Sequence, residues 1–260
     1  MALNIDESFR PRLGARWRAT QVGGGRLALV EEGLRLALVG ASAARYADAQ
    51  IDDYAGMARR DFPWRPPLRL LVRARASGPL LGTAGFGFWN NPFSPLGGWP
   101  ALPAAIWFFH ASPPSDMPLA LGVPGYGWKA ACIDATTPRA LAWSPLALPV
   151  ALANQSERMR RRVWPRVQRD LRIAEAPIEP PGAEWREYAI EWREDGARFA
   201  IDGRTVLATD RAPRGPLGFV AWVDNQWMVA TPRGHFGWGL VDVPGQWMDL
   251  GMVSIEMLGR

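Results

Sequence analysis

Short segments in which apolar and polar residues alternate follow one another along most of the chain, separated by Gly, Pro, Asp and Asn. In Leu68–Ala76 apolar residues take alternate positions, and the positions between them hold three arginines and, as the exception, Leu71. A period of two residues is typical of a β-strand with one buried face. The pattern predicts strands at Arg26–Val30, Gly33–Val39, Tyr46–Asp52, Leu68–Ala76, Thr83–Trp89, Ala104–His110, Gly127–Ala135, Asp170–Ala176, Trp185–Arg193, Ala197–Ile201, Thr205–Thr209, Leu217–Val223, Trp227–Thr231 and Trp247–Leu258. About fourteen strands are too many for one flat sheet, so we expect an all-β fold, a two-sheet antiparallel β-sandwich.

The alternation stops between residues 138 and 169, where the spacing becomes helix-like. Ala151–Trp164 is expected to be helical, Asn154 and Ser156 are candidate caps for a second helical piece, and Pro165 should kink or end it. We expect a short helical insertion within a single domain spanning residues 1–260. Its arginines predict a cationic surface, which leaves three alternatives: a solvated helix beside the sandwich, a lid over a cleft, or contact with an anionic membrane surface or nucleic acid.

Composition narrows the class of protein. With 260 residues, 48% of them apolar and 21% charged, the chain is typical of a globular protein. Its apolar runs are shorter than the roughly 18–20 residues of a membrane span, so no transmembrane segment is expected. The first residues lack the pattern of a signal peptide, and Cys132 is the only cysteine, so we expect a cytoplasmic protein. A net charge of +5 is modest for this length, and no nucleic-acid-binding module is recognisable outside the insertion, so we expect no nucleic-acid partner.

The segment Glu184–Val206, EWREYAIEWREDGARFAIDGRTV, is the most informative in the chain. It predicts three strands, with turns at Asp195-Gly196 and Asp202-Gly203. The motif W-x-x-Y-x-I-x-W followed by D-G resembles the hairpin of laminarinase-like, family 16 glycoside hydrolases of the concanavalin A-like superfamily. The resemblance implies a jelly roll of two curved antiparallel sheets, whose concave sheet forms a cleft.

The chain departs from this family at the strand that should carry the catalytic acids. Family 16 hydrolases carry E-x-D-x-x-E or E-x-D-x-E there, since retaining hydrolysis needs two carboxyl groups about 5 Å apart. The corresponding segment here, Leu102–His110 or LPAAIWFFH, contains no carboxylate. We therefore expect the usual glycosidase mechanism to be absent and the floor of the cleft to be apolar.

Candidate site residues follow from these placements. The predicted catalytic residues are His110, at the end of the aromatic strand, and Asp134 and Asp224, at the ends of two apolar strands. The chain contains fourteen tryptophans; such large aromatic residues are core material first, but surplus tryptophan in a β protein also lines ligand grooves. The predicted ligand-binding residues are Trp89, Asn91, Trp107, Phe109, Trp128, Trp222 and Trp227.

Metal and cofactor sites find little support in the sequence. Two histidines and one cysteine do not supply a zinc site, and no glycine-rich segment opens a helix as a phosphate cradle does. We expect no cofactor and no catalytic metal, with a structural calcium ion left open.

The leading hypothesis is a non-hydrolytic jelly-roll protein that holds a largely apolar or aromatic small molecule in its concave cleft. Whether it is an enzyme stays open; proton-transfer chemistry of the cyclase, isomerase or dehydratase type would need only a dry pocket and one or two ionisable groups. The alternatives are a glycoside hydrolase with carboxylates relocated to Asp134, Glu191 or Asp224, and a carbohydrate-binding module. A further alternative is membrane or partner docking by the basic insertion, which a change of Arg160, Arg161 and Arg162 to Glu would abolish.

Overall fold

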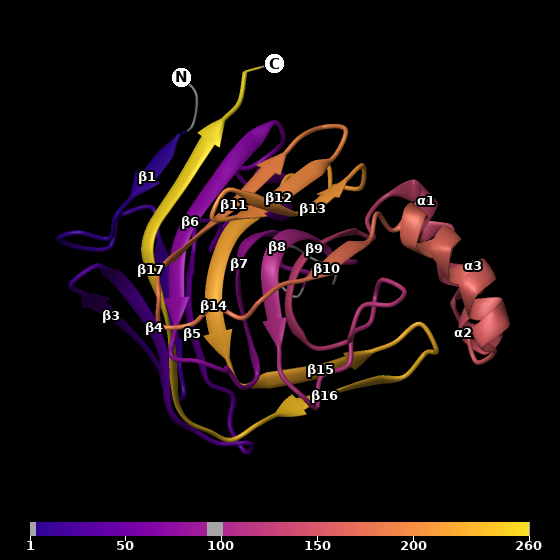
Figure 1. The fold of residues 1–260 in the computed structure, drawn as a ribbon, viewed down its shortest axis with the longest axis horizontal. Helices are drawn as coiled ribbons and strands as arrows, with labels where there is room; N and C mark the ends of the chain where they lie inside the picture. The colour runs from indigo at the N-terminus through magenta and orange to yellow at the C-terminus, as the bar shows by residue number, and fades with distance from the viewer. Residues whose placement is uncertain (1–3, 93–100, 260) are drawn as a thin grey trace.

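The computed structural model describes residues 4–92 and 101–259, and it consists of two antiparallel β-sheets packed face to face (Figure 1). The first sheet contains β1 (Ile5–Glu7), β3 (Gly25–Val30), β4 (Gly33–Ala41), β6 (Leu68–Ala76), β11 (Arg186–Trp192), β12 (Ala197–Ile201), β13 (Arg204–Thr209) and β17 (Val243–Met257). The second contains β2 (Arg18–Val22), β5 (Asp48–Asp52), β7 (Thr83–Trp89), β8 (Ala104–Ala111), β9 (Gly127–Asp134), β10 (Ala174–Pro177) and β14 (Gly218–Asp224). The predicted all-β antiparallel sandwich is confirmed.

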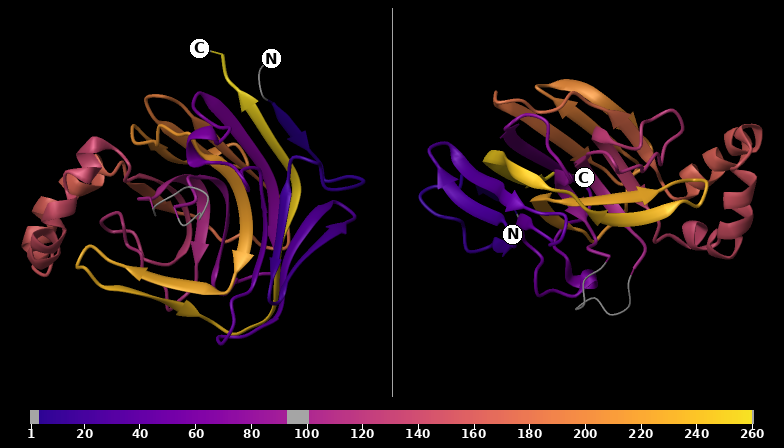
Figure 2. Two further views of the ribbon diagram at one scale, coloured as in Figure 1. Left: turned by 180° about the vertical axis from the view of Figure 1, so that it is seen from behind. Right: turned by 90° about the horizontal axis from the view of Figure 1, so that it is seen from below.

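Strands that are distant in sequence lie next to one another in both sheets. The first sheet runs β13-β12-β11-β6-β17-β4-β3, with β1 paired to β17, and the second runs β10-β9-β8-β7-β14-β5-β2. A two-stranded hairpin of β15 (Gln226–Ala230) and β16 (Phe236–Leu240) follows β14 directly. Figure 2 shows this hairpin reaching from the sandwich toward the helices.

The core between the sheets is built by the period-two pattern. In β6 the residues Leu68, Leu70, Val72 and Ala74 are buried in the core, whereas the arginines between them are partly exposed on the outer face. On the facing sheet Phe86, Phe88, Ile106 and Phe108 complete the same hydrophobic cluster. Burial of alternate residues on both sheets is the arrangement that the sequence predicts.

Three strands were missed, and one was placed too early in the chain. β1 and β2 are polar edge strands, and β16, FGWGL, is broken by glycines, so none shows a clear alternation. The strand expected at Asp170–Ala176 begins only at Ala174, because Asp170 ends a helix.

The helical insertion lies between β9 and β10 and projects from that edge of the second sheet (Figure 1). It contains α1 (Pro138–Leu141), the 3-10 turn η3 (Ser144–Leu146), α2 (Ala147–Ala153) and α3 (Glu157–Asp170); a separate 3-10 turn, η1 (Arg59–Asp61), precedes β6. We call residues 138–170 the helical arm. Among the described residues, no helix combines the length and apolar composition of a membrane span.

The ends of the helices differ in detail from the prediction. Helix α3 continues through Pro165, so of the two expected effects of this proline, a kink or a helix end, the second is wrong. A proline removes one backbone hydrogen bond, here to the carbonyl of the exposed Arg161, which water can satisfy. Ser156 precedes α3 but makes no side-chain cap bond, whereas Asn154 ends α2 and donates instead to the carbonyl of Pro232.

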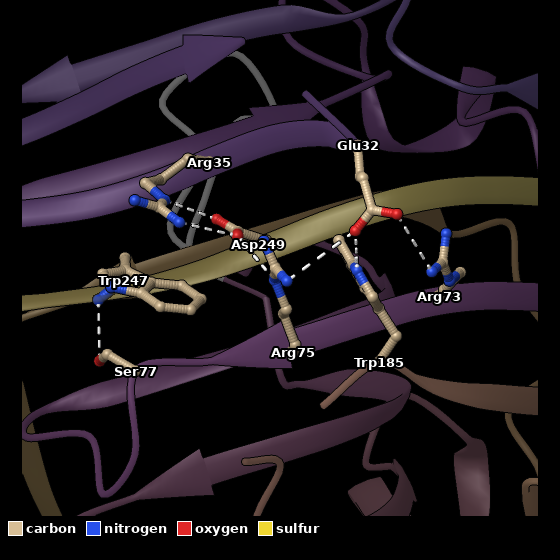
Figure 3. A network of polar contacts seen from close by, with 8 residues as sticks. All are labelled: Glu32, Arg35, Arg73, Arg75, Ser77, Trp185, Trp247 and Asp249. Atoms are coloured by element: carbon tan, nitrogen blue, oxygen red, sulfur yellow. Dashed lines mark hydrogen bonds and ion pairs between the residues drawn. The ribbon is translucent and has the colours of Figure 1, made fainter. Parts of the chain in front are cut away.

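The outer face of the first sheet is braced by alternating arginine and tryptophan side chains (Figure 3). The buried carboxylate of Asp249 on β17 accepts hydrogen bonds from Arg35 on β4 (2.7 and 2.9 Å) and from Arg75 on β6 (3.0 Å). The Arg35 guanidinium lies 4.1 Å from the ring centre of Trp247, and that of Arg75 lies 4.4 Å from the ring centre of Trp185. One buried acid therefore ties three neighbouring strands together, and the indoles limit the exposure of the two cations.

Candidate functional site

The face of the second sheet that points away from the core carries an aromatic surface. In β8, Ile106 and Phe108 face the core, so Trp107 and Phe109 point the other way. The same alternation puts Trp222 of β14 on this outward face. The aromatic surface consists of Tyr54, Phe62, Trp89, Trp107, Phe109, Val220 and Trp222.

Two glycines of β7 make room for the large rings. β7 lies between β14 and β8, and its outward-facing positions include Gly85 and Gly87. A Cβ atom on Gly85 would lie 2.9 Å from the Trp222 ring, and one on Gly87 would lie 2.6 Å from Cβ of Trp107. Because no side chain stands between them, Trp107 and Trp222 approach to 5.3 Å between ring centres across β7.

The rings pack on one another and are oriented by hydrogen bonds. Trp107 stacks on Phe109 with ring centres 5.2 Å apart and an angle of 21° between the planes. Trp222 donates its indole N–H to Oγ1 of Thr83 at 2.9 Å, and Trp89 donates to the hydroxyl of Tyr54 at 2.5 Å. Trp222 and Tyr54 are buried, whereas Trp89, Trp107 and Phe109 remain half-buried. The arrangement therefore presents three partly exposed aromatic rings in fixed orientations.

A pair of acidic side chains adjoins this surface. Asp224 of β14 lies directly opposite Asp48 of β5, and both are buried. Burial raises the pKa of Asp224 to about 6, and burial together with the Asp224 charge raises the pKa of Asp48 well above its ordinary value. Oδ1 of Asp48 has no hydrogen-bond partner among the described residues, whereas Oδ1 of Asp224 accepts bonds from the Thr83 hydroxyl (2.8 Å) and from the Gln226 amide (3.0 Å). Both pKa values are therefore shifted in the direction that favours the protonated form.

His110 does not lie on the aromatic surface. His110 follows Ile106 and Phe108 at intervals of two residues, so it points to the core side of β8 as they do. Its ring stacks on Trp128 with 5.2 Å between ring centres. Nε2 lies 2.9 Å from the carbonyl oxygen of Leu80, and burial lowers the pKa of the ring. The geometry is that of a neutral histidine within the packed interior, on the opposite side of β8 from Trp107.

The structure does not bring together Asp134, Glu191 and Asp224, the three acids proposed from the sequence as relocated catalytic carboxylates. Asp134 lies at the core-facing end of β9, where it accepts bonds from the Thr136 amide (3.0 Å) and hydroxyl (2.6 Å). Glu191 lies on the outer face of the first sheet, 3.9 Å from Arg193. Only Asp224 shares a sheet face with the aromatic surface, and its nearest acidic neighbour is Asp48, which the sequence did not suggest.

The predicted ligand-binding residues divide into two groups. Trp89, Trp107, Phe109 and Trp222 come together on the aromatic surface. Trp128 belongs to the core cluster, and the Trp227 ring covers Gly239 in the β15–β16 hairpin. Asn91 follows β7 with a positive φ of 41°, and its backbone carbonyl accepts a hydrogen bond from Arg59 at 3.1 Å. Tyr54, Phe62 and Asp48 were missed, since no local motif marks them.

A buried ion pair lies on the same face of the second sheet, where β9 and β10 form the edge. Lys129 of β9, the only lysine in the chain, lies 3.3 Å from Glu175 of β10 and donates to the Met117 carbonyl at 3.2 Å. Glu175 also accepts from the Ala120 amide at 2.8 Å. Segment 116–120 therefore covers both charged groups, and burial lowers the pKa of Lys129 and raises that of Glu175.

Metal ligands do not cluster in the described part of the chain. No group of three or more His, Cys, Asp or Glu side chains is placed to hold an ion among residues 4–92 and 101–259.

Comparison with known proteins identifies the fold. No family model and no curated protein matches the sequence. Among solved structures, the Crh5 transglycosylase superposes with a TM-score of 0.53 at 13% identity, covering 98% of this chain and 85% of the other. SCLam, a non-specific endo-beta-1,3(4)-glucanase from family GH16, gives 0.51 at 11% identity, with 96% and 89% covered. The carbohydrate recognition domain of Emp47p gives 0.51 at 11%, with 98% and 94% covered. The fold is a concanavalin A-like jelly roll.

Proposed function

We propose that the protein binds carbohydrate on the aromatic surface of its second sheet and does not hydrolyse it. The observation that carries the proposal is the set of partly exposed, fixed rings of Trp89, Trp107 and Phe109. Sugar rings have apolar C–H faces that stack on such rings, and a preorganised aromatic side chain loses little conformational entropy on binding.

Polar groups for sugar hydroxyls border the rings. Gln50 of β5 is the direct cross-strand neighbour of Trp222, and its side chain is partly exposed. Its amide donates to Asp52 at 3.0 Å, which holds the amide beside the aromatic surface. An apolar patch bordered by an amide suits a carbohydrate better than the largely apolar or aromatic small molecule of the leading hypothesis.

The jelly-roll fold also supports carbohydrate binding. The named structures with this fold include a transglycosylase, a glucanase and a carbohydrate recognition domain, and their low identity makes them a guide to the ligand class only. Non-hydrolysis rests on β8, where the positions facing outward are Ala105, Trp107 and Phe109 and offer no acid.

The test is binding of a panel of oligosaccharides from β-1,3-glucan, β-1,4-glucan and chitin, followed by calorimetry and tryptophan fluorescence. Trp107→Ala should weaken binding at least about tenfold, because a stacking ring is lost. Trp238→Ala is the matched control, since its indole is 67% exposed on the β15–β16 hairpin. Equal loss in the two variants, or no binding by the unaltered protein, would refute the proposal.

Hydrolysis by Asp48 and Asp224 is the second candidate function, because two carboxyl groups with raised pKa values face one another on adjacent strands. The two side chains are only 4% and 5% exposed, and Asp224 is held by Thr83, which favours a structural role. Release of reducing sugar from the same panel, abolished by Asp224→Asn with binding retained, would establish hydrolysis and contradict the non-hydrolytic proposal.

A further inference from the structure

Several large apolar side chains of the helical arm are exposed to solvent. Leu148 and Leu152 of α2 are 70% and 64% exposed, and their spacing of four residues puts them on one side of the helix. Leu141, Leu146 and Met159 are also exposed on the arm. A helix that merely packs beside a sandwich turns its leucines inward, so this exposure points to a partner.

Arginines form a stripe along the neighbouring helix. Arg158, Arg162, Arg166 and Arg169 of α3 recur every three or four residues, and all are exposed. Among the described residues none of them forms an ion pair with an acid, whereas Arg160 and Arg161 are paired with Glu157. The stripe therefore presents cations that have no counter-charge within the described part of the protein.

The arm also accounts for the charge of the whole molecule. Residues 138–170 contain seven arginines and two acidic residues, a net charge of +5, which equals the formal net charge of all 260 residues. The remainder of the chain carries 23 basic and 23 acidic residues and is balanced. A long-range attraction to anions is thus concentrated on the arm.

The β15–β16 hairpin extends the exposed apolar region. Its turn contacts the arm: Asn154 donates to the Pro232 carbonyl at 2.8 Å, and Gln155 donates to the Arg233 carbonyl at 2.8 Å. Just beyond this turn, Phe236 and Trp238 of β16 are 73% and 67% exposed. Figures 1 and 2 both show the hairpin tip beside the end of the arm that carries α2.

We propose that the helical arm and the hairpin dock onto an anionic lipid bilayer. The leucines, Phe236 and Trp238 enter the interface between headgroups and acyl chains, and the arginine stripe binds the lipid phosphates. Exposed leucines on α2, together with arginines on the adjoining α3 that have no acidic partner among the described residues, fit a charged membrane surface, where apolar burial and attraction to anionic lipid act together. A polynucleotide would use the arginines and leave the leucines in water. This docking does not depend on carbohydrate binding at the aromatic surface.

The test is co-sedimentation of the full chain with vesicles of phosphatidylcholine alone and with vesicles containing roughly one third phosphatidylglycerol. The protein should bind only the anionic vesicles, less at high salt, with a blue shift of tryptophan emission as Trp238 leaves water. Leu148→Ser with Leu152→Ser should weaken binding by about tenfold or more. Arg158→Glu with Arg162→Glu and Arg166→Glu should abolish it.

The matched control reverses three exposed arginines on the β11–β13 edge of the first sheet, by Arg193→Glu, Arg198→Glu and Arg204→Glu. These changes alter the net charge equally and should leave vesicle binding within about twofold of the unaltered protein. Circular dichroism establishes that each variant is folded. Absence of binding, an equal loss in the control, or indifference to the leucine changes would overturn the proposal. A dimer in solution that the leucine changes dissociate, without vesicle binding, would assign the face to a second copy instead.

Discussion

Gly85 shows how a single residue shapes the aromatic surface. A Cβ atom there would lie 2.4 Å from the Phe108 carbonyl oxygen and 2.9 Å from the ring of Trp222. The backbone oxygen cannot move without disturbing the ladder between β7 and β8, so the ring and the strand must both shift. The size of this one residue therefore controls how closely the tryptophans of β8 and β14 approach.

Gly85→Ala should destabilise the protein by about 1–3 kcal/mol, because the added methyl group overpacks this site. It should also weaken the carbohydrate binding proposed for this surface, since Trp222 is displaced. Urea unfolding and calorimetry measure the two effects. Gly245→Ala is the control: no heavy atom lies within 4 Å of its Cβ position, and its stability should change by less than about 0.5 kcal/mol. Similar losses in both variants would contradict the role of Gly85.

The Asp48–Asp224 pair predicts a pH dependence of stability. The raised pKa means that folded Asp48 binds its proton more tightly than the unfolded chain does, so folding is favoured while the group is protonated and weakened as it ionises at higher pH. Asp48→Asn removes this cost while keeping an acceptor for the Tyr46 hydroxyl. Its stability relative to the unaltered protein should rise between pH 5 and pH 8.

Urea unfolding at the two pH values measures this change. Asp210→Asn serves as the control, because the Asp210 side chain is 90% exposed and its replacement should behave the same at both pH values. A constant difference between Asp48→Asn and the unaltered protein from pH 5 to pH 8 would contradict the argument.

At the scale of single elements, the hairpin depends on a buried amide. Asn154 is fully buried, and its side-chain amide donates to the Pro232 carbonyl at the hairpin turn. Asn154→Ala should leave that carbonyl without a partner, at a cost of about 1–3 kcal/mol, and should speed amide hydrogen exchange in β15 and β16. Gln155→Ala removes an exposed bond to the next residue and should have a smaller effect. Unchanged exchange in Asn154→Ala would show that the hairpin is held elsewhere.

Most elements could be predicted from the sequence because their signals are local. Alternation within β6 and β7, the apolar run of β8 and the turns at Asp195-Gly196 and Asp202-Gly203 indicate strands without reference to distant residues. Which face a strand buries is a different matter. In β8 both sets of side chains are apolar, so the sequence does not decide which set faces the core. The prediction also placed His110 with Trp107 and Phe109, although strand alternation puts it on the opposite side of β8. The neighbouring strand β7 decides which face of β8 is buried, because its phenylalanines take the core face and its glycines leave room on the other face.

At the scale of the whole molecule, the candidate site depends on register between distant strands. Asp48 meets Asp224 only because β5 and β14 pair in the second sheet, and Tyr54 meets Trp89 only because the segment after β5 folds over the same face. No spacing along the chain marks such encounters. The jelly roll could therefore be predicted from local patterns and from resemblance, whereas the composition of the aromatic surface required the structure.

The burial of Lys129 has a practical consequence. As the only lysine of the chain, 2% exposed beneath segment 116–120, it offers one side-chain amine that reagents such as succinimidyl esters can reach only when that segment lifts. The rate of Lys129 acylation therefore measures how often segment 116–120 opens. Local opening of this segment can therefore be followed through Lys129, without an introduced label.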